Sequence, residues 1–169
     1  MSAPTVTLDP MTEAEFEAWV PPSVRGLAED NVAAGRWTRQ EALELAKSQF
    51  AILLPDGLAT RGQLLYTVRD AASGGAVGTI WICLRPKADK REAFVYDFIV
   101  DAEHRGKGYG RAAMLAAAER ARELGAASVG LHVFGHNTVA RELYTSLGFV
   151  PTNITMSLEL ATEPGNAAG

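Results

Sequence analysis

The chain has 169 residues, of which 47% are hydrophobic and 21% charged, values typical of one water-soluble domain with a sizeable core. Its formal net charge of −4 argues against a broad nucleic-acid-binding surface, and its single cysteine, Cys83, excludes an internal disulfide and a cysteine-rich metal site. No apolar run of about 18 residues and no export signal are present. We therefore expect a cytoplasmic protein without a metal and without membrane or nucleic-acid partners.

The first third of the chain has the patterns of one strand and three helices. Residues 5–8 alternate like a strand, and residues 11–15 begin a capped helix with acidic residues in its first turn. Because proline lacks a backbone N–H, we expect Pro21-Pro22 to end or kink that helix. Further helices are predicted at 24–34 and 38–53, the latter opening with a threonine and a glutamate spaced as a capping box.

From residue 64 the hydrophobic period changes to two, which predicts a sheet. Strands are expected at 64–68 and 76–84, joined as a hairpin by the turn 72–75, and a longer strand at 92–100. After a glycine-rich loop at 106–110, the expected elements are a helix at 111–124, a strand at 128–134, a helix at 138–147 and a strand at 154–160.

This order of elements predicts an α/β chain of the α+β type, with a mixed, mostly antiparallel sheet of six to seven strands and helices on both faces. Residues 1–160 are expected to form a single domain, and residues 161–169 a disordered tail.

The most informative segment is the glycine-rich loop, where a strand end, a turn and a helix start follow one another directly. Backbone N–H groups at a helix N-terminus attract anions, and glycines let a phosphate approach the backbone closely. Two other phosphate loops do not fit, because Arg111 occupies the third glycine position of a dinucleotide fingerprint and Tyr109 follows Gly108 where a Walker loop needs lysine. A tight polar turn without a ligand is the alternative.

Two motifs in one stretch give the sequence a family resemblance. One is R-x-x-G-x-G at 105–110, and the other is N-x-x-A-x-x-L-Y-x-x-x-G-F at 137–149, with a helix and a strand between them. Over residues 92–150 the chain resembles the GNAT superfamily of N-acetyltransferases. The resemblance implies a GNAT-like fold, acetyl-CoA as the co-substrate and an amine as the acceptor.

The resemblance also implies where coenzyme A binds. Its pyrophosphate would lie on the backbone N–H groups of residues 105–111, and its pantetheine beside the strand at 98–100, where one N–H would polarise the thioester carbonyl. The expected coenzyme-binding residues are Phe98, Ile99, Val100, Arg105, Gly106, Lys107, Gly108, Tyr109, Gly110, Arg111 and Asn137. The strand side chains could equally serve only as sheet core.

Three residues are candidates for proton transfer. Attack by an amine needs its neutral form, so a base is useful at neutral pH. Asp97 precedes the pantetheine strand, and His132 points away from the aliphatic face of its own strand. By analogy with the family, Tyr144 protonates the departing thiolate. The alternatives are a salt-bridged Asp97, a structural His132 and a Tyr144 that only caps the core, with Asn137 capping its helix.

Other residues carry weaker predictions. Cys83 is expected to pack as a small hydrophobic residue rather than act as a nucleophile. Four aromatic residues could line the acceptor site or fill the core, namely Trp19, Trp37, Phe50 and Trp81.

The acceptor stays open among a free amino acid or polyamine, an antibiotic amine, and a protein N-terminus or lysine, and so does a homodimer. A non-catalytic acyl-CoA-binding regulatory domain and an enzyme that uses a longer acyl-CoA are competing interpretations.

Overall fold

A five-stranded sheet forms the centre of the computed structural model, which describes residues 3–160. Its strand order follows the sequence: β1 (Val6–Pro10), β2 (Gln63–Asp70), β3 (Ala76–Lys87), β4 (Lys90–Val100) and β5 (Ser128–Leu131). The first four strands pair antiparallel, and β4 pairs with β5 in parallel. The mixed, mostly antiparallel sheet is thus confirmed, but its described part has five strands instead of six or seven.

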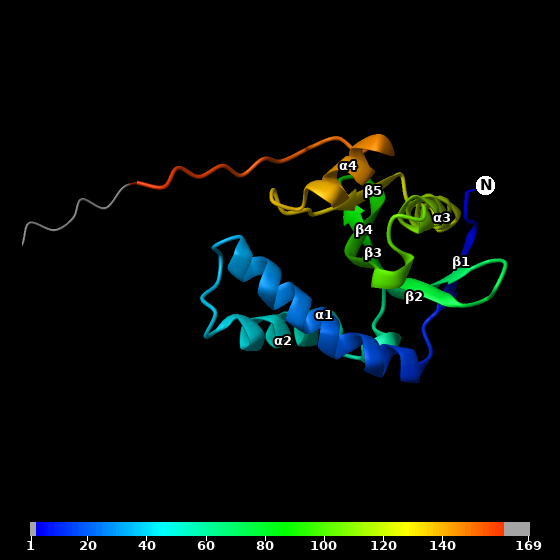
Figure 1. The fold of residues 1–169 in the computed structure, drawn as a ribbon, viewed down its shortest axis with the longest axis horizontal. Coiled ribbons are helices and arrows are strands. Elements are labelled where there is room, and N and C mark those ends of the chain that lie inside the picture. Colours follow the sequence, from blue (N-terminus) through cyan, green and yellow to red (C-terminus); the bar gives the residue numbers. More distant parts are fainter. Residues whose placement is uncertain (1–2, 161–169) are drawn as a thin grey trace, which may run out of the picture.

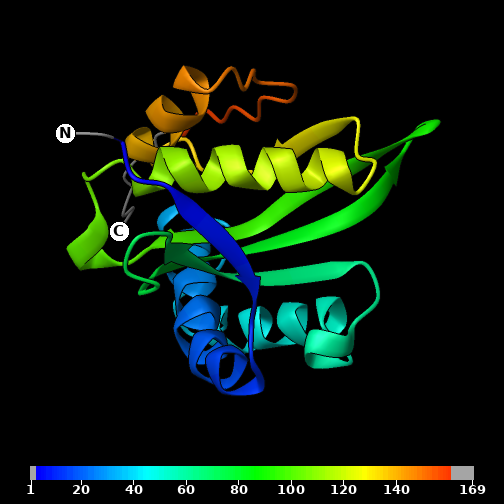
Figure 2. The ribbon, with the colours of Figure 1, turned by 90° about the vertical axis from the view of Figure 1, so that its right-hand side faces the viewer.

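Helices cover both faces of the sheet, as the sequence predicts. The elements are α1 (Glu13–Ala33), α2 (Ala42–Leu53), α3 (Tyr109–Glu123) and α4 (Thr138–Ser146), with short 3₁₀ turns η1 (Gly57–Ala59) and η2 (Ala102–His104). Figure 2 shows α3 lying along one face, while α1 and α2 lie against the other. None of the helices within residues 3–160 has the length and apolar character needed to cross a membrane.

The two layers bury separate cores. On one side of the sheet, Ile80, Ile82 and Val95 pack against Met114 of α3. On the other side, Trp81 packs against residues of α1 and α2. Successive residues of β3 therefore serve opposite cores, as the period of two along a strand requires.

Helix α1 corrects one prediction, because it continues through Pro21 and Pro22 instead of ending there. Each proline leaves the carbonyl four residues earlier without an intrahelical donor. Those carbonyls belong to Glu17 and Ala18, which are exposed, so water can hydrate them. The start of α1 is as predicted, since Thr12 and Glu15 form a reciprocal capping box.

Helix α2 is shorter than predicted and begins at Ala42. The predicted capping contacts nevertheless form one turn earlier. The Thr38 N–H donates to the Glu41 carboxylate at 3.1 Å, and the Glu41 N–H donates to the Thr38 hydroxyl at 3.4 Å.

The C-terminal part departs most from the prediction. Strand β5 ends at Leu131 rather than at residue 134, and residues 154–160 form no strand. Instead, residues 150–160, which we call the C-terminal arm, extend from the end of α4 away from the body (Figure 1). The tail predicted at 161–169 lies outside the described residues.

Candidate active site

The glycine-rich loop joins the end of β4 to the start of α3. Gly106 and Gly108 have φ angles of 71° and 91°, a left-handed conformation that side chains disfavour. Gly108 is the N-cap of α3 and supplies no side chain to the first turn, and the first i to i−4 bond of that turn runs from the Ala112 N–H to the Gly108 carbonyl. The N–H groups of residues 109–111 therefore have no partner within the helix, which is the arrangement that binds anions.

Gly110 brings three elements together at this loop. A Cβ at Gly110 would lie 3.2 Å from Leu143 of α4 and 3.9 Å from Val100 at the end of β4. The absence of a side chain thus lets the N-terminus of α3 approach α4 closely.

The charged and aromatic side chains of the loop are partly occupied by contacts within the protein. The Arg105 guanidinium donates to the Val100 carbonyl at 2.9 Å, and Arg111 donates to the Ser146 hydroxyl at 2.7 Å. The Tyr109 hydroxyl donates to Asp70 at 2.9 Å, whereas Lys107 is exposed. The Tyr109 side chain thus anchors the loop to β2, and of Tyr109 only the backbone is left to bind a ligand.

A β-bulge at Tyr96 shapes the strand before the loop. Trp81 pairs with Asp97 but its neighbour Ile82 pairs with Val95, so Tyr96 is an extra residue in β4. The parallel pairing of β4 with β5 also stops at Val95. Beyond the bulge, no described strand pairs with this edge of β4, so residues 97–100 have no strand partner on that side; we call this unpaired edge the wedge.

The bulge also decides which way Asp97 faces. Alternation from the buried Val95 would put Asp97 on the α3 side of the sheet. The extra residue moves Asp97 to the α1 side, where one carboxylate oxygen accepts hydrogen bonds from Trp19 Nε1 and Ser23 Oγ, each at 3.2 Å. Burial raises the pKa of the Asp97 carboxyl, and these two hydrogen bonds partly oppose the rise.

Tyr144 comes to the same region from α4. It is half-buried, and its ring lies 5.6 Å from that of Phe149. Burial raises the pKa of the Tyr144 hydroxyl, and the negative charge of Asp97 raises it further. Two of the three predicted proton-transfer residues are therefore near enough for the charge of Asp97 to act on the Tyr144 hydroxyl.

His132 lies just beyond the end of β5, in a cluster of aromatic and charged residues. Its ring meets that of Phe134 edge-on at 5.0 Å. Phe134 also stacks on His136, and the Arg36 guanidinium lies over the Phe134 ring at 5.2 Å from its centroid. Partial burial and the charge of Arg36 lower the pKa of His132, so the imidazole is neutral at pH 7. Asn137 caps α4 by accepting from the Ala140 N–H at 3.2 Å.

Comparison with known proteins decides the family. The model of the acetyltransferase (GNAT) family matches residues 19–149. The chain belongs to the GNAT family of acetyltransferases. It is therefore an acetyl-CoA-dependent N-acetyltransferase, in agreement with the resemblance seen in the sequence.

Relatives of this GNAT protein occur in Bacillus subtilis (strain 168). The uncharacterized N-acetyltransferase YycN is 38% identical over 92% of this chain and 99% of its own, and YdgE is 38% identical over 91% and 98%. The crystal structure of YycN matches with a TM-score of 0.88 and covers 94% of this chain and 100% of that one. The GNAT fold is thus shown by sequence and by structure.

Two residues of this GNAT site could not be found from the sequence. Trp19 and Ser23 precede Asp97 by 78 and 74 residues, and no motif links them to it. Trp19 was expected either in the core or at the acceptor site; it is buried in the α1–α2 core while its indole N–H reaches Asp97. Trp81 and Phe50 belong to the same core, and Trp37 packs against it.

Cys83 is poorly suited to act as a nucleophile. Burial raises the pKa of the Cys83 thiol, which disfavours the thiolate that a nucleophile needs. Among residues 3–160, no group of three or more His, Cys, Asp or Glu side chains could hold a metal ion.

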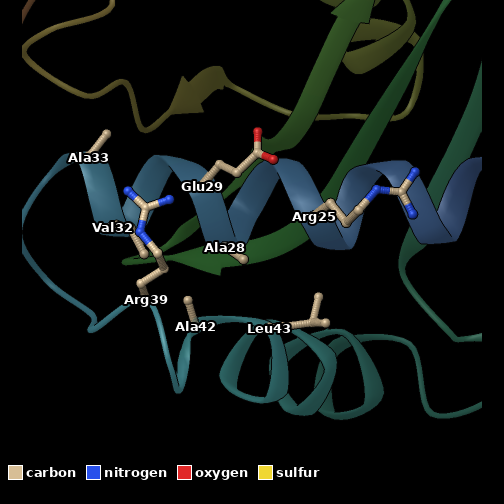
Figure 3. Close-up of a pocket in the computed structure, with 8 residues that line it drawn as sticks. All are labelled: Arg25, Ala28, Glu29, Val32, Ala33, Arg39, Ala42 and Leu43. Carbon is tan, nitrogen blue, oxygen red and sulfur yellow. The ribbon is translucent and has the colours of Figure 1, made fainter.

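A separate hollow of about 350 Å³ lies between α1 and α2 (Figure 3). It is lined by Arg25, Ala28, Glu29, Val32, Ala33, Arg39, Ala42 and Leu43. It shares no residue with the glycine-rich loop or with β4.

Proposed function

We propose that this protein transfers the acetyl group of acetyl-CoA to a primary amine of a small molecule or peptide by direct attack in a ternary complex. The observation that carries the proposal is that the charge of Asp97, on the part of β4 that β5 does not pair with, raises the pKa of the Tyr144 hydroxyl. A domain that only bound acyl-CoA would need the loop but neither of these groups.

The loop and the wedge would hold the co-substrate. The left-handed glycines and the three N–H groups of residues 109–111 fit a pyrophosphate, and the unpaired edge at 98–100 fits an amide-containing chain that adds to the sheet. We assign coenzyme binding to Phe98, Ile99, Val100, the loop 105–111 and Asn137. One N–H of the β4 edge would stabilise the oxyanion that forms on the thioester carbonyl.

In the proposed step, the amine nitrogen forms a bond to the acetyl carbon and the carbon–sulfur bond breaks. Asp97 accepts the proton that leaves the amine, directly or through one water molecule. Tyr144 gives its proton to the thiolate sulfur, and its raised pKa keeps the hydroxyl protonated at neutral pH until that moment. Trp19 and Ser23 hold the Asp97 carboxylate in position.

His132 is the second candidate base. Its lowered pKa leaves the imidazole free to accept a proton at pH 7. Asp97 is preferred because it interacts with Tyr144, whereas His132 interacts with Phe134 and Arg36.

The test is release of coenzyme A thiol from acetyl-CoA across a panel of amino acids, polyamines, peptides and aminoglycosides, with calorimetric binding of acetyl-CoA to the same protein. We expect binding, and release with one acceptor class. Binding without release from any acceptor would favour the non-catalytic binder, and a protein that does not bind acetyl-CoA would overturn the assignment of the loop.

A further inference from the structure

The hollow between α1 and α2 is a second concave site, built from other residues than the proposed acetyl-transfer site. Its volume of about 350 Å³ lies within the range of pockets that bind small molecules, about 300 to 1,000 Å³. Most of its lining is apolar, and Ala28, Val32, Ala42 and Leu43 contribute to it from both helices. A lining of this kind suits the hydrocarbon part of a ligand.

Two arginines border the apolar lining at its two ends. Figure 3 shows Arg39, in the turn before α2, pointing toward α1 at one end of the hollow, and Arg25 of α1 at the other end. Within residues 3–160, neither guanidinium takes part in a hydrogen bond or an ion pair. Both therefore keep their donors free for a ligand, and a guanidinium can bind a carboxylate through two parallel hydrogen bonds.

Glu29, the third charged residue of the lining, does not cancel this positive charge. Its carboxylate points away from α2 (Figure 3), and among the described residues it forms no ion pair with Arg25 one turn earlier. Two arginines and one glutamate give the lining a net charge of +1, in a chain whose net charge is −4. The hollow therefore favours an anion over a cation.

The separation of the two arginines sets the length of that anion. Helix α1 rises about 12 Å over the eight residues from Arg25 to Ala33, which lines the end of the hollow where Arg39 lies. A straight chain of about eight carbons with a carboxylate at each end is slightly shorter than this, and the long arginine side chains can close the difference. A molecule with one carboxylate would leave one guanidinium without a partner.

We propose that the hollow between α1 and α2 binds an aliphatic dicarboxylate of about eight carbons. One carboxylate lies on Arg25 and the other on Arg39, and the methylene chain covers the apolar lining between them. The bound molecule joins α1 to α2 without touching the glycine-rich loop or β4.

Binding in this hollow would be transmitted to the candidate active site through α1. Val32 of the lining follows Ser23 by nine residues, about two and a half turns, so the two lie on opposite sides of the helix. Ser23 donates to Asp97 on its side. A ligand that holds α1 against α2 therefore stabilises the helix that positions the Asp97 carboxylate.

Calorimetry with suberate, the eight-carbon dicarboxylate, tests the proposal. We expect suberate to bind, and octanoate and the corresponding eight-carbon diamine to bind at least about tenfold more weakly. Arg25→Gln with Arg39→Gln should weaken suberate binding by at least about tenfold. Arg61→Gln with Arg122→Gln removes the same charge from exposed positions outside the hollow and should leave binding unchanged. Hydrogen exchange at 23–33 should slow when suberate is added.

Four results would overturn the proposal. No binding of suberate would mean that the hollow is not a dicarboxylate site, and equal binding by the two double variants would place suberate elsewhere on the surface. Octanoate that binds as tightly as suberate would mean that one carboxylate is enough. A dimer in which residues 25–43 exchange slowly without suberate would mean that a second copy fills the hollow.

The outcome does not depend on the proposed function, because binding of acetyl-CoA is measured separately on the same variants. Both double variants should bind acetyl-CoA as the unmodified chain does, since none of the four arginines belongs to the glycine-rich loop or to β4. Circular dichroism checks their folding, which we expect to be retained because all four side chains are exposed.

Discussion

At the scale of single residues, the proposed mechanism uses the Asp97 carboxyl and the Tyr144 hydroxyl, whose pKa values both lie above their usual values. For Tyr144 the rise favours an acid that is still protonated at neutral pH. For Asp97 the rise brings the carboxyl closer to the pH at which an enzyme works, which suits a base.

Replacing Tyr144 by phenylalanine should lower turnover at least about tenfold while coenzyme binding is retained, because only the proton donor is lost. Steady-state kinetics and calorimetry of acetyl-CoA binding measure the two effects. Tyr66→Phe is the matched control, since the Tyr66 hydroxyl accepts from Arg120 at 3.2 Å, remote from the wedge. Unchanged turnover in Tyr144→Phe would remove the residue from the mechanism.

Asp97 predicts a pH dependence with a definite sign. A carboxyl must be ionised to act as a base, so kcat/KM should fall as the pH falls through the pKa of Asp97. Burial raises this pKa above the usual value of about 3.9. Asp97→Asn should lower kcat/KM by about a hundredfold and flatten this acidic limb. Asp101→Asn, four residues on, serves as the control. If the limb persists in Asp97→Asn and disappears in His132→Gln, the base is His132.

The stability of the fold should respond to Asp97 in the opposite sense. A carboxyl whose pKa is higher in the folded than in the unfolded chain holds its proton more tightly when folded, so its ionisation destabilises the fold as the pH rises. Asp97→Asn should therefore raise the melting temperature at pH 7.5 more than at pH 4.5, as thermal unfolding would measure. An equal effect at both pH values would contradict a raised pKa.

At the scale of elements, α3 offers a comparison between its two ends. Gly108 before the helix and Gly125 after it both have positive φ angles, 91° and 79°. Alanine at either position should cost about 1 kcal/mol of folding free energy from backbone strain. Only Gly108→Ala should also weaken acetyl-CoA binding, by roughly tenfold, because a Cβ there would lie 3.0 Å from Pro4 and displace the loop. Equal binding by the two variants would argue against the loop as the phosphate site.

Most elements could be predicted from local patterns, whereas the geometry of the wedge could not. The hairpin, the long fourth strand and the glycine after α3 each follow from hydrophobic period and turn residues. The bulge at Tyr96 has no local signal, since aromatic and apolar residues follow one another there. It reverses the face on which Asp97 lies and so brings Asp97 to Trp19 and Ser23. The prediction that Pro21-Pro22 would end or kink α1 was wrong, because water can hydrate the exposed carbonyls that lose their donors.

At the scale of the whole molecule, the proposed co-substrate site joins distant parts of the chain, so binding of acetyl-CoA there should stabilise the entire fold. A ligand at about 100 times its Kd adds about 2.7 kcal/mol to the free energy of unfolding. For a chain of 169 residues this corresponds to a rise of about 5 to 10 °C in Tm. Thermal unfolding with acetyl-CoA should show the rise, and adenosine, which lacks the pyrophosphate, should not reproduce it. No change with acetyl-CoA at saturation would contradict the assignment of the loop.

The open edge of β4 beyond the bulge presents main-chain groups, and every amino acid except proline carries the same N–H. Recognition by such an edge is therefore largely independent of which side chains occupy positions 98–100. Evolution can exchange these side chains to suit the core beneath them without loss of the donor, and proline is the one substitution that removes it. Divergent members of the family could in this way conserve a function at positions where their sequences have ceased to agree.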